Sequence, residues 1–305
     1  IVRHIVRRSM KLSNSRLNQY RMCPRSYFYK YVCGIEPIEE GEVEHDRSFG
    51  QAIHKGIEAL YKGKGMEACI SQFKESYPNQ LDFEDLSKTQ ESGKILLKAY
   101  WNQYQGLMKD WKVLAVEVLD EYEPIEGIIF RLKLDLIAEN LKYGGIYGFD
   151  WKTTGKSLNY QYWGQFNPNA QISTYFDYIT SKYGQCAGFY IDALSFWYRQ
   201  RKYKNEPAGF HYKIERQMFS QTKDQIADWR DSEYWYEHQL KESQDRNEWP
   251  MNTSQCRFCS YRPICSAGWS WENDKDLILS QYTQRSTNEQ PKGESNAVSP
   301  RVPSE

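Results

Sequence analysis

Two neighbouring stretches of the sequence decide the fold: IIFRLKLDLIAE, residues 128–139, and GFDWKTTGKS, residues 148–157. In the first stretch apolar and polar residues alternate, which is typical of a β-strand with one buried face. A period of two places one set of apolar residues on one face, namely Ile128, Phe130, Leu132, Leu134 and Leu136. It places Asp135 on the opposite face, together with Arg131 and Lys133. This strand is therefore predicted to present a carboxylate away from its apolar face.

In the second stretch the same alternation groups Asp150 with Lys152 and turns Phe149 and Trp151 the other way. Two adjacent strands that carry Asp and Asp-x-Lys can bring two carboxylates and an ammonium group to one point. These groups can hold a divalent cation and activate water against a phosphodiester. Strands on a protein surface also carry charges at this spacing, so the pattern alone leaves a solvated strand face as the alternative.

The composition is that of a globular protein, with 305 residues, 40% hydrophobic and 26% charged residues, and a formal net charge of zero. This length suffices for one large domain or two small ones. The sequence has no apolar run of membrane-spanning length and no signal-peptide pattern. We therefore expect a cytoplasmic protein of a bacterial, archaeal or phage-infected cell, without a membrane partner.

The basic residues are unevenly placed along the chain. Residues 1–35 contain 8 Lys or Arg and no Asp or Glu, and a second basic and aromatic run, FWYRQRKYK, spans residues 196–204. Each run alone is compatible with a solvated surface. Beside a metal site, both runs favour a groove that binds phosphates and stacks a single strand.

The periodicity predicts a mixed α/β or α+β core. A helix capped by Ser13 is expected to be interrupted or restarted at Pro24. Further helices are expected over 49–61, 87–109, 168–182 and 223–244, and strands over 113–121, 126–138, 145–152, 187–197 and 209–219. We expect one domain over 10–282, an N-terminal extension at 1–9 and a disordered tail at 283–305.

The seven cysteines include a closely spaced triplet in CRFCSYRPIC, Cys256-x2-Cys259-x5-Cys265. In an intracellular chain such clustering indicates metal ligands more than disulfides. A fourth ligand is required, and the N-terminal motif YRMCPRSYFYKY offers Cys23. Such a site would close a loop of about 240 residues and so constrain the unfolded chain. Zinc and a four-iron cluster both suit four thiolates.

Other candidate site residues flank the two strands. His54 lies on a predicted helix in GQAIHKGIEAL, where its imidazole could serve a metal or simply pack. Gln171 and Tyr175 in QISTYF stand at i and i+4, so they share one helix face, either in the site or as a half-buried pair. Glu117 in VLAVEVLDE is a further candidate ligand or base-orienting group.

Several motifs together resemble the PD-(D/E)XK nuclease superfamily: SRLNQYRMCPRSYFYKY, GQAIH, LKLDLI, FDWKTT, QISTY and C-x2-C-x5-C, in this order. The resemblance covers residues 12–268. It is to the RecB-like branch with a C-terminal iron–sulfur clasp, which includes AddB nuclease domains and CRISPR-associated iron–sulfur exonucleases. It implies a restriction-endonuclease-like core, in which helices flank a central mixed sheet, with a helical clasp around a four-cysteine cluster.

The resemblance also implies a role for each matching residue. The ligands of Mg²⁺ or Mn²⁺ would be His54, Asp135 and Asp150. Lys152 would position or help to deprotonate the attacking water. Gln171 and Tyr175 match a QxxxY motif that organises the site and contacts DNA. The ligands of a 4Fe–4S cluster, or alternatively of Zn²⁺, would be Cys23, Cys256, Cys259 and Cys265.

Two departures blur the subfamily. The third motif is Asp-x-Lys, where many CRISPR-associated members have Glu, and Leu134 stands in place of the proline of the superfamily name. The segment GKS at 155–157 is no Walker A ending, because Gly148 lies seven residues before Gly155 and a P-loop needs five. We therefore see no sign of a fused ATP-driven helicase.

The function implied is that of a metal-dependent deoxyribonuclease, an exonuclease of DNA recombination, repair, phage DNA processing or CRISPR adaptation. Its partners would be single-stranded DNA or duplex ends, and a helicase, a recombinase or a CRISPR integrase. The alternative from another class is a non-catalytic DNA-binding or assembly protein with a structural four-cysteine metal site.

Overall fold

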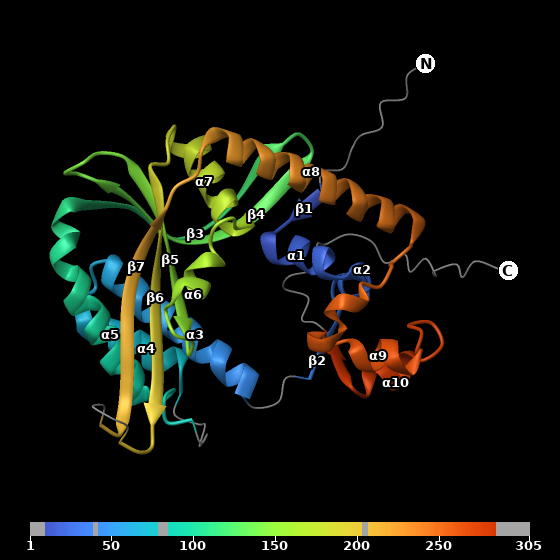
Figure 1. Ribbon diagram of the computed structural model, residues 1–305, viewed down its shortest axis with the longest axis horizontal. Helices are drawn as coiled ribbons and strands as arrows, with labels where there is room; N and C mark the ends of the chain where they lie inside the picture. Colours follow the sequence, from blue (N-terminus) through green and yellow to red (C-terminus); the bar gives the residue numbers. More distant parts are fainter. Residues whose placement is uncertain (1–9, 39–41, 79–84, 203–206, 285–305) are drawn as a thin grey trace. The chain divides into compact units, whose positions relative to one another are not determined.

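The computed structural model describes residues 10–38, 42–78, 85–202 and 207–284 (Figure 1). The expected extension at 1–9 and the tail from residue 285 onward lie outside the described residues. The chain divides into two compact units. The sheet unit comprises residues 40–124 and 131–229, and the cysteine unit comprises residues 1–39, 125–130 and 230–305. The expectation of a single domain over 10–282 stays a prediction.

The sheet unit is built on five long strands. They are β3 (Trp111–Ile125), β4 (Ile128–Asn140), β5 (Ile146–Thr154), β6 (Gly188–Arg199) and β7 (Gly209–Phe219). Their order is β4-β5-β6-β7, and β3 pairs with β4. The pair β5–β6 is parallel, whereas β4–β5 and β6–β7 are antiparallel. The sheet is therefore mixed, as expected.

Helices cover both faces of this sheet (Figure 1). They are α3 (Glu42–Tyr61), α4 (Gly65–Ser76), α5 (Gln90–Tyr104), α6 (Tyr160–Gly164) and α7 (Ala170–Tyr183), and the 3-10 helix η2 (Gln105–Asp110) follows α5. Helices α3, α4 and α5 share one apolar cluster with the sheet, and α6 and α7 share another. The predicted fold class, a mixed α/β core with helices flanking a central sheet, is confirmed.

The strand β4 departs from strict alternation beside Asp135. Leu132 and Leu134 pack in the cluster with α7, whereas Leu136 and Ala138 pack in the cluster with α3. The prediction that Leu136 shares a face with Leu132 and Leu134 is therefore wrong. Apolar residues at alternate positions do not reveal such a slip in the sequence, because both faces of this sheet are covered and both accept leucine. The slip lies at the residue whose carboxylate enters the candidate site.

The cysteine unit is made of short elements. They are β1 (Met10–Leu12), α1 (Asn14–Met22), α2 (Pro24–Tyr27), the π-helix η1 (Phe28–Val32), β2 (Ile35–Pro37), the 3-10 helix η3 (Thr253–Phe258), α9 (Arg262–Ala267), α10 (Lys275–Leu279) and β8 (Tyr282–Gln284). As predicted, the Ser13 hydroxyl caps α1, and Pro24 begins a new helix at a position where its missing N–H is not needed. Helix α8 (Lys223–Arg246) begins in the sheet unit and ends in the cysteine unit.

Several short elements escape prediction from the sequence. The strand β1 is 3 residues long and pairs with the first residues of β4, while β2 pairs with β8 across more than two hundred residues of sequence. Such strands carry too few residues for a period to be read. Within the described ranges, none of the helices combines the length and the apolar character needed to cross a membrane.

Candidate active site

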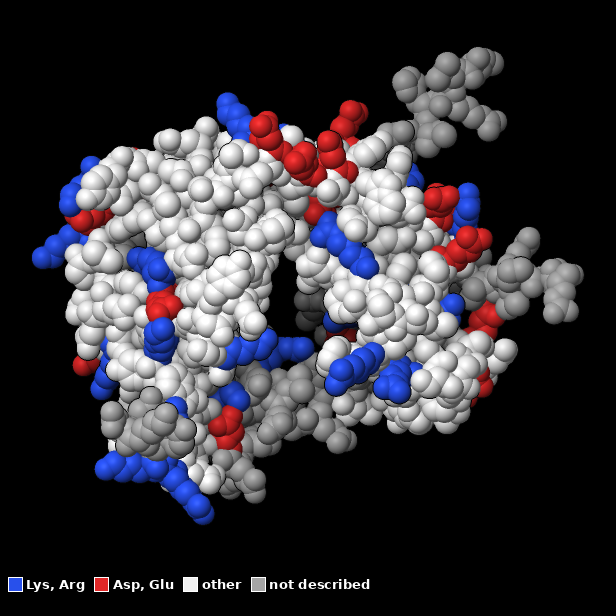
Figure 2. Space-filling view, in the orientation of Figure 1, with Lys and Arg blue, Asp and Glu red and all other residues white. Residues whose placement is uncertain are grey.

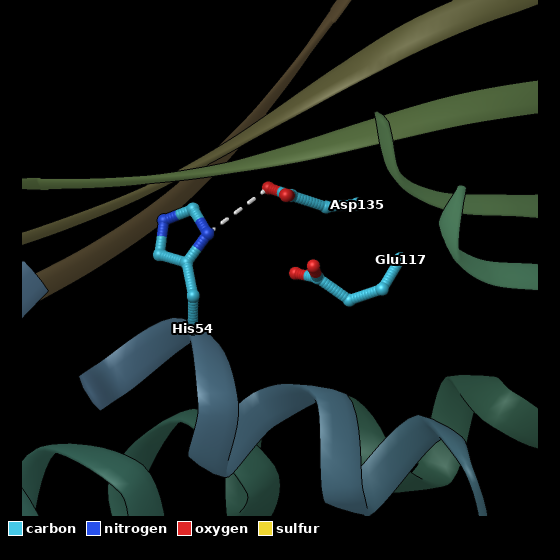
Figure 3. Close-up of side chains that lie close together, drawn as sticks. All are labelled: His54, Glu117 and Asp135. Carbon is cyan, nitrogen blue, oxygen red and sulfur yellow. Dashed lines mark ion pairs between the residues drawn. The ribbon is translucent and has the colours of Figure 1, made fainter. Parts of the chain in front are cut away.

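His54 reaches the site because α3 packs closely on β5. A Cβ atom at Gly50 would come within 2.9 Å of the Thr153 side-chain oxygen, so glycine permits this approach. His54 follows one helical turn later, and its Nδ1 lies 3.3 Å from Oδ2 of Asp135. Figure 3 shows the imidazole rising from α3 towards Asp135 and Glu117. Helix α3 and the sheet thus contribute side chains that face each other.

Asp135 and Asp150 are both 4% exposed, so their carboxylates depend on protein partners. Oδ2 of Asp135 accepts a hydrogen bond of 2.8 Å from the backbone N–H of Trp151. Oδ2 of Asp150 lies 2.5 Å from Nζ of Lys152. As expected, the Asp150 and Lys152 side chains lie together. Trp151 packs with Phe149 in the apolar cluster on the other face.

The first turns of α7 support Lys152 from the other side. The Asn169 side chain caps this helix by accepting from the N–H groups of Gln171 and Ile172. Oε1 of Gln171 accepts from Nζ of Lys152 at 3.4 Å, and its Nε2 donates to the Tyr175 hydroxyl at 2.8 Å. The Tyr175 hydroxyl then donates to the Lys133 carbonyl on β4 at 2.5 Å. The QxxxY pair therefore links β5 to β4 through the helix.

Glu117 on β3 completes a compact group of ligand-type atoms. One atom each of His54, Glu117 and Asp135 all lie within 4.8 Å of one another (Figure 3). The backbone φ of Glu117 is 54°, in the left-handed region that an L-residue seldom adopts. Its Oε2 pairs with Nζ of Lys133 at 2.7 Å, while its Oε1 is buried and accepts no hydrogen bond from the described residues.

Burial and charge shape the proton affinities here. Burial would raise the pKa of Asp135, but the His54 imidazole and the Trp151 N–H outweigh it and lower that pKa. Burial raises the pKa of Asp150, and nearby Asp135 raises it further. Burial would lower the pKa of Lys152, but the Asp150 carboxylate overcomes this and raises it. The carboxylates therefore differ in their ease of ionisation, and Lys152 keeps its charge.

The four candidate thiols lie around one small cavity in the cysteine unit. Its volume is about 20 Å³, and its lining includes Cys23, Cys256, Cys259 and Cys265. The Asn252 N–H donates to Sγ of Cys23 at 3.4 Å. Burial raises the pKa of the Cys259 and Cys265 thiols, and the Arg25 cation opposes this at Cys265. The triplet and the remote Cys23 thus line the same cavity, and their role as ligands of one metal group stays a prediction.

The two basic runs lie in different units. In the cysteine unit, Arg21 pairs with Glu233, and Nε of Arg25 donates to the Trp249 carbonyl at 2.6 Å. These arginines therefore also hold this unit together. In the sheet unit, residues 196–202 belong to β6 and the turn after it, and residues 203–204 lie outside the described residues. Figure 2 shows Lys and Arg in separate small groups on the face in view, in keeping with the zero net charge.

Comparison with known proteins decides the family. The family model of the PD-(D/E)XK nuclease superfamily matches residues 11–266. The chain belongs to this superfamily. A nuclease of this superfamily is a metal-dependent hydrolase, and the group of His54, Glu117 and Asp135 fits a divalent-metal site. No curated protein matches the chain.

The superfamily assignment agrees with a solved structure of the same fold. A protein from Eubacterium rectale, provisionally named an exonuclease, superposes with a TM-score of 0.50 at 12% identity, over 85% of this chain and 90% of its own. A protein named SSO0001 superposes with a TM-score of 0.29 at 12% identity, over 72% of this chain and 85% of its own. At these identities, the first likeness concerns the fold alone.

One buried network beside the candidate site has no counterpart among the predicted residues. Arg216 donates to Asp192 at 2.6 and 2.8 Å, and the Tyr100 hydroxyl donates to the same carboxylate at 2.7 Å. Tyr61 bonds Tyr100 at 2.9 Å and stacks on Trp151 with centroids 5.6 Å apart. A single aspartate within the apolar run of β6 was the available signal, because such a charge needs a buried partner.

Proposed function

We propose that this superfamily member is a deoxyribonuclease that depends on Mg²⁺ or Mn²⁺ and releases nucleotides from DNA ends. The observation that carries the proposal is the compact group of His54, Glu117 and Asp135, next to the ion pair of the buried Asp150 with the half-buried Lys152. Carboxylate oxygens and one imidazole suit Mg²⁺ and Mn²⁺ better than they suit soft metal ions. The buried, unsatisfied Oε1 of Glu117 supports the same reading.

The chain's own residues would divide the work. His54, Asp135 and Asp150 would hold the metal, with Glu117 as an additional or alternative ligand. A bound divalent ion would lower the pKa of a water molecule and offset phosphate charge. Lys152 is held by Asp150 and Gln171, so its ammonium can orient that water and stabilise charge that develops on the phosphate. Gln171 and Tyr175 would fix Lys152 relative to β4.

The test uses Asp150→Asn, which keeps the side-chain volume and removes the charge. We expect the variant to fold and to lose at least about a hundred-fold in cleavage of end-labelled DNA in Mg²⁺ or Mn²⁺, because metal and Lys152 both lose their anionic partner. Asp120→Asn, in the same unit and paired with Lys182, is the matched control and should keep full activity. Undiminished cleavage by purified Asp150→Asn protein would contradict the proposal.

Two substrate comparisons refine the activity. An exonuclease should degrade linear DNA and spare covalently closed circles, and labels at the 5′ or 3′ end report its polarity. The alternative, a non-catalytic DNA-binding or assembly protein, is supported if wild-type protein binds linear DNA but releases no nucleotides with either ion. Neighbouring genes for a helicase, a recombinase or a CRISPR integrase would indicate the pathway and the partner.

We also propose that the four cysteines hold a 4Fe–4S cluster rather than zinc. Cys23 joins the triplet Cys256-x2-Cys259-x5-Cys265 around one cavity, and this arrangement resembles the iron–sulfur clasp of the RecB-like branch. Four thiolates suit either metal group, so the test must separate them. Anaerobically purified protein should absorb broadly near about 400 nm, whereas colourless protein with one bound zinc would favour the alternative.

A further inference from the structure

The hairpin of β6 and β7 extends beyond the catalytic strand. Pairing between β5 and β6 ends at Ser195, whereas pairing between β6 and β7 continues to Arg199. Ala193 stands opposite Lys152 in this register. Because side chains alternate along a strand, Trp197 lies on the face of Ala193 and Lys152, roughly 13 Å further along β6. The same sheet face thus continues from the candidate site to an aromatic residue.

Trp197 forms a flat aromatic pair with His211 on β7. The two rings are nearly parallel, with an interplanar angle of 12° and centroids 5.8 Å apart. Nε2 of His211 lies 2.8 Å from the Pro207 carbonyl oxygen, which fixes the imidazole. Both residues are partly exposed. The indole N–H of Trp197 is buried and has no hydrogen-bond partner among the described residues, so hydrogen bonding does not explain a tryptophan here.

Two lysines lie close to this pair along the chain and the sheet. The exposed Lys156 follows β5, and its carbonyl accepts from the Ser195 hydroxyl at 2.7 Å, which holds this segment over β6. Lys213 is the partner of Ser195 on β7, and its side chain is 53% exposed and lies 2.5 Å from Glu215. Both lysines stand at the level of Ser195, two residues from Trp197 along β6, so basic residues lie next to the aromatic pair. Aromatic rings next to basic residues match the bases and phosphates of a single nucleic-acid strand.

We propose that Trp197, His211, Lys156 and Lys213 form a binding area for single-stranded DNA beside the catalytic site. A base stacks against the Trp197–His211 pair, and the phosphates on the Ser195 side of that base pair with the two lysines. The area holds the strand in line with Lys152, so that successive phosphodiesters reach the same metal site. This inference deepens the proposed nuclease function and rests on it.

The test measures binding of a labelled oligothymidylate by fluorescence anisotropy in the Asp150→Asn background, which separates binding from cleavage. Trp197→Ala should weaken binding about ten-fold, as expected for the loss of one stacked base, and Trp197→Phe should restore most of it. Tyr198→Ala is the matched control, because Tyr198 is 39% exposed on the opposite face of the same strand. On an abasic oligonucleotide, the Trp197→Ala substitution should weaken binding by a smaller factor.

Equal affinities of Trp197→Ala and Tyr198→Ala would overturn the inference, and so would an equal loss on blunt duplex DNA, which offers no splayed base. If Trp197→Ala unfolds, as its melting temperature will show, His211→Ala takes its place with the same expectation. The two proposals fail separately. If the wild-type protein never cleaves DNA but binds it through Trp197, only the proposed nuclease function is wrong. If the wild-type protein cleaves DNA and Trp197→Ala binds normally, only the proposed binding area is wrong.

Discussion

Glu117 illustrates how much a single backbone angle contributes to this site. A φ of 54° in a strand costs roughly 1–3 kcal/mol for a residue with a side chain. The residue with this angle places its carboxylate close to His54 and Asp135. The strand pattern around residue 117 carries no sign of this angle, so the sequence identified Glu117 only as an accessory candidate.

The first prediction concerns metal binding by this residue. Glu117→Gln keeps the shape of the side chain and removes its negative charge, so Mn²⁺ should bind about ten-fold more weakly or worse in isothermal titration calorimetry. The control is Glu139→Gln, because Glu139 is a partly exposed carboxylate on β4 that pairs only loosely with Lys112, at 3.7 Å. Equal Mn²⁺ affinities of the two variants would remove Glu117 from the site.

At the scale of elements, an ion pair and a hydrogen bond tie β3 to α7. Asp120 accepts from Nζ of Lys182 and from the Tyr178 hydroxyl, both at 2.6 Å. These hydrogen bonds lower the pKa of Asp120 from 3.8 to about 2. Because the folded pKa lies below the unfolded one, this contribution to stability is complete above about pH 4 and is lost as the pH falls towards 2.

The second prediction follows from this difference between the folded and unfolded pKa of Asp120. Asp120→Asn should lower the free energy of unfolding by under about 1 kcal/mol at pH 7, since the pair is partly exposed and screened by solvent. The gap between variant and wild type should narrow as the pH is lowered below about 4, in urea unfolding series at each pH. A gap that stays constant over this range would assign the effect to packing rather than to charge.

The third prediction concerns the pairing of β6 with β7 through Asp192 and Arg216. Asp192→Asn leaves a buried guanidinium without its anion, so it should lower the free energy of unfolding by about 3–5 kcal/mol. The double variant Asp192→Leu with Arg216→Met should lose less, because neither charge is then buried alone. Urea unfolding measures both. Lys112→Met removes an exposed pair and should change stability by under about 1 kcal/mol.

At the scale of the whole molecule, the cysteine unit joins parts of the chain that are far apart in sequence. Cys23 lines one cavity with the C-terminal triplet, and β2 pairs with β8. Closing so long a loop is costly in chain entropy, so a cluster bound by these four cysteines, as we propose, would stabilise the folded chain. Apart from the part of α8 that it includes, the described elements of this unit are short.

The fourth prediction tests this dependence. Cys259→Ser should lose the iron content and the visible absorption, and its melting temperature should fall by at least about 5 °C. Cys33→Ser is the matched control, because Cys33 belongs to the same unit and does not line the cavity. Should both variants keep equal iron and equal melting temperatures, the cluster assignment fails.

Most long elements of the fold were predictable, because their apolar residues repeat with the period of a helix or a strand over many residues. The predicted strand at 145–152 and the predicted helix at 168–182 correspond to β5 and α7 within two residues at each end. Short elements such as β1 and β2 were not predictable, since their partners, and not their own residues, decide them.

The sequence by itself determined the superfamily, the order of the long elements, and the grouping of Asp150 with Lys152, because motif spacing and strand alternation are local properties of the chain. Only the tertiary structure decided the slip in β4 beside Asp135, the left-handed backbone of Glu117 and the network from Arg216 to Trp151. Each of these depends on contacts between elements far apart in sequence. Packing and charge pairing across such distances select one conformation that no local pattern specifies.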